Sequence, residues 1–307
     1  MIRLRCMTFP FLLSSLLTTS AFADTSARTQ YPIVLAHGMG GFDHLFGVVD
    51  YFYGVSTTLR KAGAEVYVTR VSSFNETELR GEQLLAQVEY IVAVSGAEKV
   101  NLIGHSHGGL DVRYVAAMRP DLVASVTTVA TPHGGAEIAD YLRSHIVEGS
   151  FSEEVLSFFA DSLGTVLQLL TGHDSPEDAI AGVNSLTTER IAAFNALYPN
   201  GVPTDYCEDG ADEVDGIRYF SWSGASPVTN LFDVSDPYFK LASFFSSEKN
   251  DGFVGKCSSH FGWVIRDDYR MNHGDEVNQV LGLTSWFESN PKTVFKNHAT
   301  RLKNLGL

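Results

Sequence analysis

Residues 100–109 read Val-Asn-Leu-Ile-Gly-His-Ser-His-Gly-Gly, and this stretch decides the fold. An apolar run ends at Gly104, and a helical pattern begins near Leu110. A Gly-x-Ser-x-Gly segment in this context is a sharp turn from a strand into a helix that presents its serine at the apex. Gly104 and Gly108 suit the turn because a strained serine leaves no room for β-carbons beside it. The stretch predicts Ser106 as a nucleophile.

The sequence around this turn alternates between short apolar runs and helical patterns. Short runs bounded by turn residues fit buried parallel strands, and their alternation with helices indicates a doubly wound α/β sheet. The expected strands cover residues 31–36, 66–68, 100–103, 126–130 and 218–222, and the expected helices cover 55–62, 78–94 and 110–118. The predicted class is α/β, with a mostly parallel central sheet flanked by helices.

Composition restricts the possible partners. The chain has 307 residues and a formal net charge of -14, from 22 Lys+Arg against 36 Asp+Glu. A nucleic-acid-binding surface needs concentrated positive charge, so this balance disfavours nucleic acid. It also disfavours electrostatic adsorption to anionic membranes. Any contact with lipid is therefore expected to be apolar.

The N-terminus has the pattern of a secretory signal peptide. Arg3 and Arg5 precede a short apolar run over residues 9–17, and Ala21-Phe22-Ala23 fits a small-x-small cleavage site. We expect cleavage after Ala23, secretion, and one catalytic domain over residues 24–307. An uncleaved anchor is the alternative, but the apolar run is short for a membrane span.

Export to an oxidising compartment predicts the state of the cysteines. Cys6 leaves with the signal peptide, so the mature chain keeps Cys207 and Cys257. An even pair in an oxidising compartment predicts one disulfide, which closes a loop of about fifty residues. Two buried thiols are the alternative.

Ester chemistry at a serine needs backbone donors for the oxyanion that forms. One is expected to be the amide that follows the nucleophile, at His107. The other should come from a loop after an early strand, and Ala-His-Gly-Met-Gly-Gly occupies residues 36–41. We expect the Met39 amide to be that donor, although a plain glycine turn would read in the same way.

The serine also needs a histidine to take its proton and a carboxylate to orient that histidine. In this fold the chain order is serine, acid, histidine. That order leaves His260, His273 and His298 as bases. Asp251 lies in an Asn-Asp-Gly turn and is either the acid or an ordinary turn residue. Spacing does not choose among these histidines.

Residues 150–172 form an amphipathic helical pattern after the strand that ends at Ala130. It opens on a possible capping box at Ser150. The pattern fits an ordinary helix packed on the sheet, or a lid over an apolar site.

Several strings together resemble the foldase-dependent secreted bacterial lipases of the Pseudomonas and Proteus type, which are true triacylglycerol lipases of the α/β-hydrolase fold. The strings span the mature chain and are much more specific than Gly-x-Ser-x-Gly. They are Tyr-Pro-Ile-Val-Leu-Ala-His-Gly-Met from Tyr31, Gly-His-Ser-His-Gly-Gly from Gly104, Arg-Tyr-Val-Ala-Ala from Arg113, Arg-Pro-Asp-Leu from Arg119, Tyr-Phe-Ser-Trp-Ser-Gly from Tyr219, Asn-Asp-Gly from Asn250, Cys-Ser-Ser-His from Cys257 and Asn-His-Gly-Asp-Glu-Val-Asn-Gln from Asn272.

The resemblance implies roles for residues that spacing leaves open. It implies Asp251 as the acid, His273 as the base, and Met39 and His107 as the oxyanion donors. It implies a disulfide between Cys207 and Cys257. It also implies one structural Ca²⁺, held by the carboxylates of Asp233 and Asp275 and the backbone carbonyls of Gln279 and Leu283, an oxygen ligand set that suits a hard cation.

The resemblance further implies a lid at about residues 150–172, a membrane-tethered lipase-specific foldase as partner, and export through the periplasm. The chain departs from the family at Met39-Gly40-Gly41 and at Gly109-Leu110-Asp111. Neither change removes a catalytic group. The segment from Asp233 to Asp251 is also slightly shorter than in some relatives.

The expected function is therefore hydrolysis of triacylglycerols at a lipid–water interface through a Ser-Asp-His triad and an acyl-enzyme. A carboxylesterase for soluble short-chain esters is the nearer alternative. A non-catalytic binding protein on the same scaffold is the more distant one.

Overall fold

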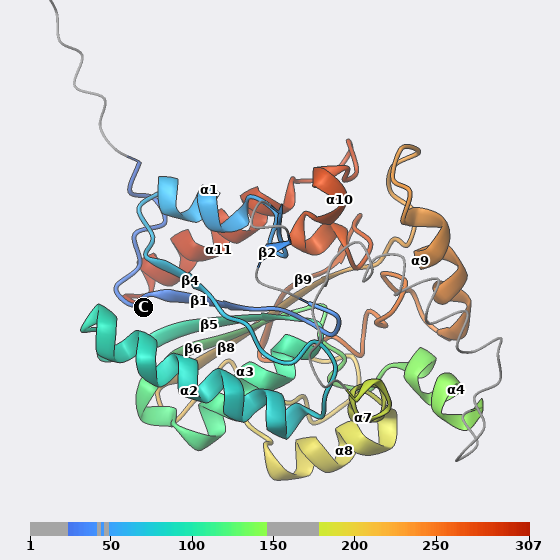
Figure 1. The fold of residues 1–307 in the computed structure, drawn as a ribbon, viewed down its shortest axis with the longest axis horizontal. Helices are drawn as coiled ribbons and strands as arrows, with labels where there is room; N and C mark the ends of the chain where they lie inside the picture. The colour runs from blue at the N-terminus through green and yellow to red at the C-terminus, as the bar shows by residue number, and fades with distance from the viewer. Residues whose placement is uncertain (1–23, 42–43, 46–48, 146–177) are drawn as a thin grey trace, which may run out of the picture.

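The computed structural model describes residues 24–41, 44–45, 49–145 and 178–307 (Figure 1). The predicted signal peptide and the helix predicted at residues 150–172 lie outside these ranges. None of the described helices is both long and apolar enough to cross a membrane.

Among the described residues, seven strands form the central sheet. They run in the order β4-β1-β5-β6-β8, with β7 and β9 both paired to β8. All neighbours are parallel except β7 and β8. The strands are β1 (Ile33–Ala36), β4 (Val66–Val68), β5 (Val100–His105), β6 (Val123–Val129), β7 (Glu213–Val214), β8 (Ile217–Gly224) and β9 (Trp263–Tyr269); β2 (His44–Leu45) and β3 (Val49–Asp50) form a separate antiparallel pair.

The described helices cover both faces of this sheet. Figure 1 shows α1 and α11 on one face and α2 and α3 on the other, with α4, α7 and α9 together at one end of the sheet. The helices are α1 (Val55–Lys61), α2 (Thr77–Ser95), α3 (His107–Met118), α4 (Glu137–His145), α7 (Ala179–Ser185), α8 (Thr188–Leu197), α9 (Asp236–Ala242), α10 (Gln279–Gly282) and α11 (Pro291–Asn304); short 3₁₀ turns are η1 (Pro120–Leu122), η3 (Ser243–Phe245) and η4 (Asp275–Val277).

Both faces of the sheet are apolar, as its sequence requires. Along β1, Ile33 and Leu35 face the core under α1 and α11, whereas Val34 and Ala36 face the core under α2 and α3. Side chains alternate along a strand, so a strand that is covered on both faces reads as a continuous apolar run. This explains why short apolar runs bounded by turn residues identified the early strands.

A third apolar cluster lies at the end of the sheet where the functional residues gather. It joins α3 to α4, α7 and α8 through side chains that include Leu110, Leu142, Val183 and Phe194. The predicted fold class is confirmed, and each predicted strand and helix within the described ranges is present with bounds shifted by a few residues.

Candidate active site

Ser106 lies between β5 and α3 in a conformation that few residues adopt. Its φ is 54° and its ψ is -128°. A β-carbon on Gly104 would lie 2.2 Å from the carbonyl oxygen of Gly108, and one on Gly108 would lie 2.5 Å from those of Ala36 and His37. The packing that holds the turn therefore needs glycine on both sides of the serine.

Asp251 and His273 form a hydrogen-bonded pair. Nδ1 of His273 lies 2.7 Å from Oδ2 of Asp251. The other oxygen, Oδ1, accepts hydrogen bonds of 2.8 Å from the backbone amides of Phe253 and Val254. The carboxylate is fully buried, and one of its oxygens is left to orient the imidazole. Because Nδ1 of His273 faces this carboxylate, Nε2 of His273 is the nitrogen that can exchange a proton with the serine.

Ser106 and His273 line one apolar pocket. Its remaining walls come from α4, α7 and nearby loops, with side chains that include Met39, Pro132, Ile138, Leu142, Val183, Leu186 and Phe253. Both polar residues are largely buried. An apolar pocket with a few convergent polar groups is the usual form of a site for a small apolar substrate.

Two buried titratable groups, His105 and Glu276, lie close to His273. His105 packs against His273 with 4.6 Å between ring centroids, and its Nδ1 lies 2.6 Å from the hydroxyl of Tyr51. Burial lowers the pKa of His105 well below its usual range, and it raises that of Glu276, whose Oε2 lies 3.5 Å from His105. The charge of Asp251 also raises the pKa of Glu276. Burial thus disfavours the charged forms of both groups beside the Asp251–His273 pair.

The loop that carries Met39 is held by the buried side chain of Arg80 on α2. Its guanidinium donates to the carbonyl oxygen of His37 over 2.9 Å, and also to those of Ser72 and Ser73. The amide of Gly40 in turn donates to Ser73 over 2.8 Å. Arg80 therefore fixes the loop from one side through its backbone carbonyls.

Asp111 on α3 balances the charge of Arg80. The shortest distance between them is 2.7 Å, and both side chains are inaccessible to solvent. Burial raises the pKa of Asp111 to about 6, against the opposing effect of the Arg80 charge. Because α3 begins at His107, this ion pair links the helix after Ser106 to the loop of Met39. The two expected oxyanion donors are mechanically connected.

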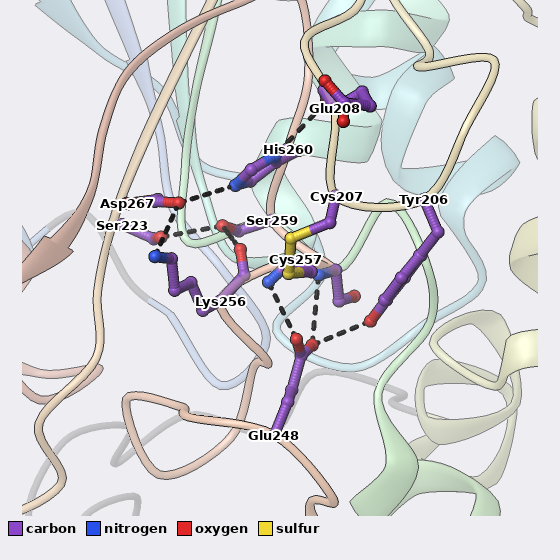
Figure 2. Close-up of a disulfide and its surroundings, with 11 residues drawn as sticks. Tyr206, Cys207, Glu208, Ser223, Glu248, Lys256, Cys257, Ser259, His260 and Asp267 are labelled. Atoms are coloured by element: carbon purple, nitrogen blue, oxygen red, sulfur yellow. Dashed lines mark hydrogen bonds and ion pairs between the residues drawn. A yellow bond between two sulfur atoms is a disulfide. The ribbon is translucent and has the colours of Figure 1, made fainter.

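Cys207 and Cys257 form the expected pair, with a Cα–Cα distance of 4.4 Å (Figure 2). Figure 2 also shows Glu248 below the disulfide, where it accepts from the backbone amides of Cys257 and Ser258 at 3.1 and 3.2 Å. Glu248 and Cys257 flank the loop that contains Asp251. The disulfide and this carboxylate together fix the base of that loop.

The expected metal ligands include two unsatisfied carboxylate oxygens. Oδ2 of Asp233 and Oδ1 of Asp275 are buried and have no hydrogen-bond partner among the described residues. Burial raises the pKa of Asp233, and it raises that of Asp275 to about 7. Val280 and Leu281 have positive φ in the turn between Gln279 and Leu283. Buried, unpaired oxygens beside a constrained turn fit a cation with oxygen ligands.

The structure separates the three histidines that the sequence left open. His273 lines the pocket beside Ser106. His260 lies 2.9 Å from Asp267, near the disulfide, and Nε2 of His298 lies 2.8 Å from the hydroxyl of Thr127 under α11. His273 is therefore the histidine whose position suits a base.

Sequence reasoning missed Arg80, Asp111, Tyr51 and Glu276. A signal existed for Arg80, which shares one helical face with apolar Leu84, Val88 and Ile91 at a spacing that buries it. A charge on such a face needs a buried partner. Glu276 follows His273 by only three residues, so the sequence alone places the two side chains in the same short segment. No pattern pointed to Tyr51.

Fold and site together define the class. A parallel sheet that presents a serine at a strand-to-helix turn, with a histidine and a carboxylate on later loops, is the architecture of the α/β hydrolases. The family described as "alpha/beta hydrolase fold" matches residues 31–277. The mature lipase BlEst2 of Bacillus licheniformis has a similar fold, with a TM-score of 0.62 at 18% identity over 90% of this chain and 93% of that one.

Proteins with similar sequences place the chain more narrowly within the α/β hydrolases. The chain is 52% identical over 303 residues to a triacylglycerol lipase of Vibrio cholerae serotype O1, covering 95% of this chain and 97% of that one. It is 42% identical over 294 residues to a triacylglycerol lipase of Pseudomonas fragi, covering 92% and 100%. The chain belongs to the α/β-hydrolase family and, within it, to the family of these triacylglycerol lipases.

Proposed function

We propose that this protein hydrolyses ester bonds of triacylglycerols at lipid–water interfaces, with Ser106, His273 and Asp251 as its triad. The observation that carries the proposal is the apolar pocket in which Ser106 lies with a histidine already oriented by a buried carboxylate. The high identity to triacylglycerol lipases supports the substrate class.

In the proposed reaction, Nε2 of His273 takes the proton of the Ser106 hydroxyl as its oxygen attacks the ester carbonyl. The imidazolium that forms is stabilised by Asp251 and gives its proton to the leaving alcohol. Water then attacks the acyl-enzyme with the same histidine as base, which releases the fatty acid and restores Ser106.

The negative charge on the tetrahedral oxygen is assigned to the backbone amides of Met39 and His107. His107 is the first residue of α3, where amides lack partners within the helix and the helix dipole favours negative charge. Arg80 keeps the Met39 loop in place through the carbonyl oxygen of His37. Such donors cost no reorganisation during the reaction because they are fixed beforehand.

We also propose one structural Ca²⁺, held by Asp233, Asp275 and the carbonyl oxygens of Gln279 and Leu283. Bound there, it would neutralise the buried carboxylates of Asp233 and Asp275, the second of which is two residues after His273, and it would stabilise the loop that carries the base. A chelator should lower the unfolding temperature of the wild-type protein. Asp233→Asn should be insensitive to the chelator, whereas Asp268→Asn, an exposed control, should respond like the wild type. An equal response in all three proteins would contradict the assignment.

Secretion through the periplasm after cleavage near Ala23, with help from a lipase-specific foldase, is proposed on the N-terminal pattern and the family resemblance. Mass spectrometry of the exported protein should find Asp24 at its N-terminus. Refolding of the mature chain from urea should give active enzyme in good yield only when the cognate foldase is present. Equal yields without it would remove the foldase from the proposal.

The decisive test measures hydrolysis of emulsified trioleoylglycerol beside that of a dissolved butyrate ester. Release of oleate that is lost in Ser106→Ala would support the lipase. Activity on butyrate alone would indicate the carboxylesterase alternative. If natively folded protein, judged by circular dichroism, hydrolyses neither substrate, the catalytic proposal fails.

A further inference from the structure

Two neighbouring segments expose apolar side chains and bury polar ones. Over residues 231–236 and 281–287 the exposed side chains are all apolar, with exposed fractions of 96% at Leu231, 73% at Trp286 and 82% at Phe287. The buried ones are the carboxylates and hydroxyls of Asp233, Ser235, Asp236, Thr284 and Ser285. This inverts the usual distribution, and large exposed apolar surfaces mark binding sites.

The two segments form one surface, which continues along α9. The rings of Phe232 and Trp286 have centroids 6.2 Å apart. The side-chain amide of Asn230 donates to the carbonyl oxygen of Thr284 over 2.9 Å and ties the loops together. Beyond α9, Phe244 is also exposed. We call the surface made by Leu231, Phe232, Val234, Phe244, Trp286 and Phe287 the outer apolar surface.

This surface is continuous with the wall of the candidate active site. Phe239, on the inner side of α9, packs against Phe253 with 5.2 Å between ring centroids. Phe253 lines the pocket, and its ring lies 5.3 Å from that of His273. Whatever covers the outer apolar surface is therefore separated from the pocket by about two layers of side chains.

The charges around the surface indicate which partner it suits. The formal net charge of the chain is -14. Even so, residues 279–287 contain no charged residue, and the carboxylates of residues 228–245 are buried, which leaves Lys240 as the exposed charge of these segments. The Lys240 ammonium lies 4.6 Å from the ring centroid of Phe244, and the Arg270 guanidinium lies 5.7 Å from that of Phe287. Long cationic side chains over aromatic rings are typical of lipid interfaces.

A protein partner fits this pattern less well. Protein–protein interfaces surround an apolar centre with polar groups that form hydrogen bonds across the contact. Here the side-chain hydroxyls and carboxylates point inward, and the exposed side chains of residues 231–236 and 281–287 offer a single hydrogen-bond donor, the indole N–H of Trp286. A lipid surface requires none.

We propose that the outer apolar surface inserts into aggregated lipid and seats the enzyme on its substrate beside the pocket. This inference rests on the proposed function for the identity of the lipid. The test uses Ser106→Ala protein, which leaves the lipid intact, and flotation with trioleoylglycerol droplets coated with phosphatidylcholine.

In that background, the double variant W286S/F287S should lower the partition coefficient by at least about tenfold, since it removes two large apolar side chains from the contact. The matched control is Y90S/V94S on α2, where Tyr90 and Val94 are 67% and 53% exposed. It should bind as the parent does. Equal binding by W286S/F287S and the parent would overturn the proposal.

Tryptophan fluorescence gives a second readout that needs no disruptive substitution. Addition of droplets should shift the emission of the parent to the blue. The shift should disappear in W286F and persist in W263F, because Trp286 enters the lipid. An emission spectrum of the parent that does not shift, or a shift that persists in W286F, would overturn the proposal. The proposal would also be overturned if the parent protein formed a dimer in solution that W286S/F287S abolished, because the surface would then bind a second copy of the chain. Oleate release by the wild type is measured separately, so failure of the lipase proposal is seen independently of binding.

Discussion

Ser106 and His273 line the same pocket, but two regions of different construction hold them. Ser106 connects β5 to α3, in the middle of the parallel sheet, and both elements are buried in the core. Asp251 and His273 lie on loops before and after β9. Those loops are held by a disulfide, by carboxylates that accept backbone amides, and by the proposed cation.

The difference separates local from long-range determinants. The turn that carries the nucleophile is encoded by one local motif, whose glycines let it pack against Ala36 and His37 at the end of β1. The base is positioned by contacts between segments far apart in the chain, such as Cys207 with Cys257. Changes to the residues that react or that contact His273 directly should therefore act on chemistry first, and changes to the contacts that support the base loops, such as the disulfide, should act on stability first.

Asp251→Asn should give the largest loss of activity. It tests the role of the carboxylate itself, apart from the contacts that hold its loop. The backbone amides of Phe253 and Val254 would hold the amide oxygen of an asparagine here, so its NH2 group would donate to Nδ1 of His273 and leave the imidazole proton on Nε2. In this tautomer Nε2 cannot take the serine proton, so kcat on a dissolved ester should fall by about 10⁴. The unfolding temperature should stay close to that of the wild type. A loss below about tenfold at saturating substrate would indicate that another carboxylate serves His273.

Asp111→Asn tests the connection between the two oxyanion donors. The change leaves the Arg80 charge buried without a partner, which should cost about 3 kcal/mol in the free energy of unfolding. Misplacement of the Met39 loop should lower kcat about 10²-fold with little change in KM. Urea unfolding and steady-state kinetics on a soluble ester measure both.

Two further variants show whether this pair positions the loop or only stabilises the fold. Replacing both partners, in R80M/D111L, should recover stability because no buried charge remains, yet kcat should stay low because the His37 carbonyl has lost its donor. Asp121→Asn breaks the exposed pair with Arg119 and should change neither quantity. Recovery of kcat in R80M/D111L would refute a positioning role.

The double variant C207S/C257S weakens the base side alone. The disulfide closes a loop across a sequence separation of 50 residues, so its loss should lower the free energy of unfolding by about 4 kcal/mol. At temperatures where the variant is fully folded, kcat should remain within a factor of about two, since neither cysteine lines the pocket. A large fall in kcat under those conditions would show that the disulfide orients Asp251 directly.

His298→Gln should give the smallest effect, and that effect is on the pH dependence of the free energy of unfolding. His298 lies in neither of the two regions compared above. Burial lowers the pKa of His298 well below its usual range, so in acid the unfolded chain binds a proton there that the folded protein does not. This histidine therefore makes the wild type less stable as pH falls below about 6.5. The cost of His298→Gln, measured at pH 7.5, should shrink by up to about 1.4 kcal/mol per pH unit below that point. A pH-independent cost would contradict the sign.

The same contrast explains what could be predicted from the sequence. The early strands follow from short apolar runs, α1 to α3 follow from helical periodicity, and Ser106 follows from one local motif. Strand β9 was missed because Arg266, Asp267 and Asp268 interrupt it and it is only partly buried. The choice of His273 over His260 and His298 needed either resemblance or coordinates, since it depends on which loops meet in space. Arg80 and Asp111 became meaningful only as a pair.

The most direct test of the central claim is covalent labelling with an active-site-directed alkyl phosphonate, mapped by mass spectrometry. The account predicts one adduct, on Ser106, in native protein, and none after unfolding in urea. In Asp251→Asn the same adduct should form much more slowly, because the base that activates the serine is impaired. No adduct, or an adduct on another serine of the native protein, would contradict the assignment of Ser106 as the nucleophile.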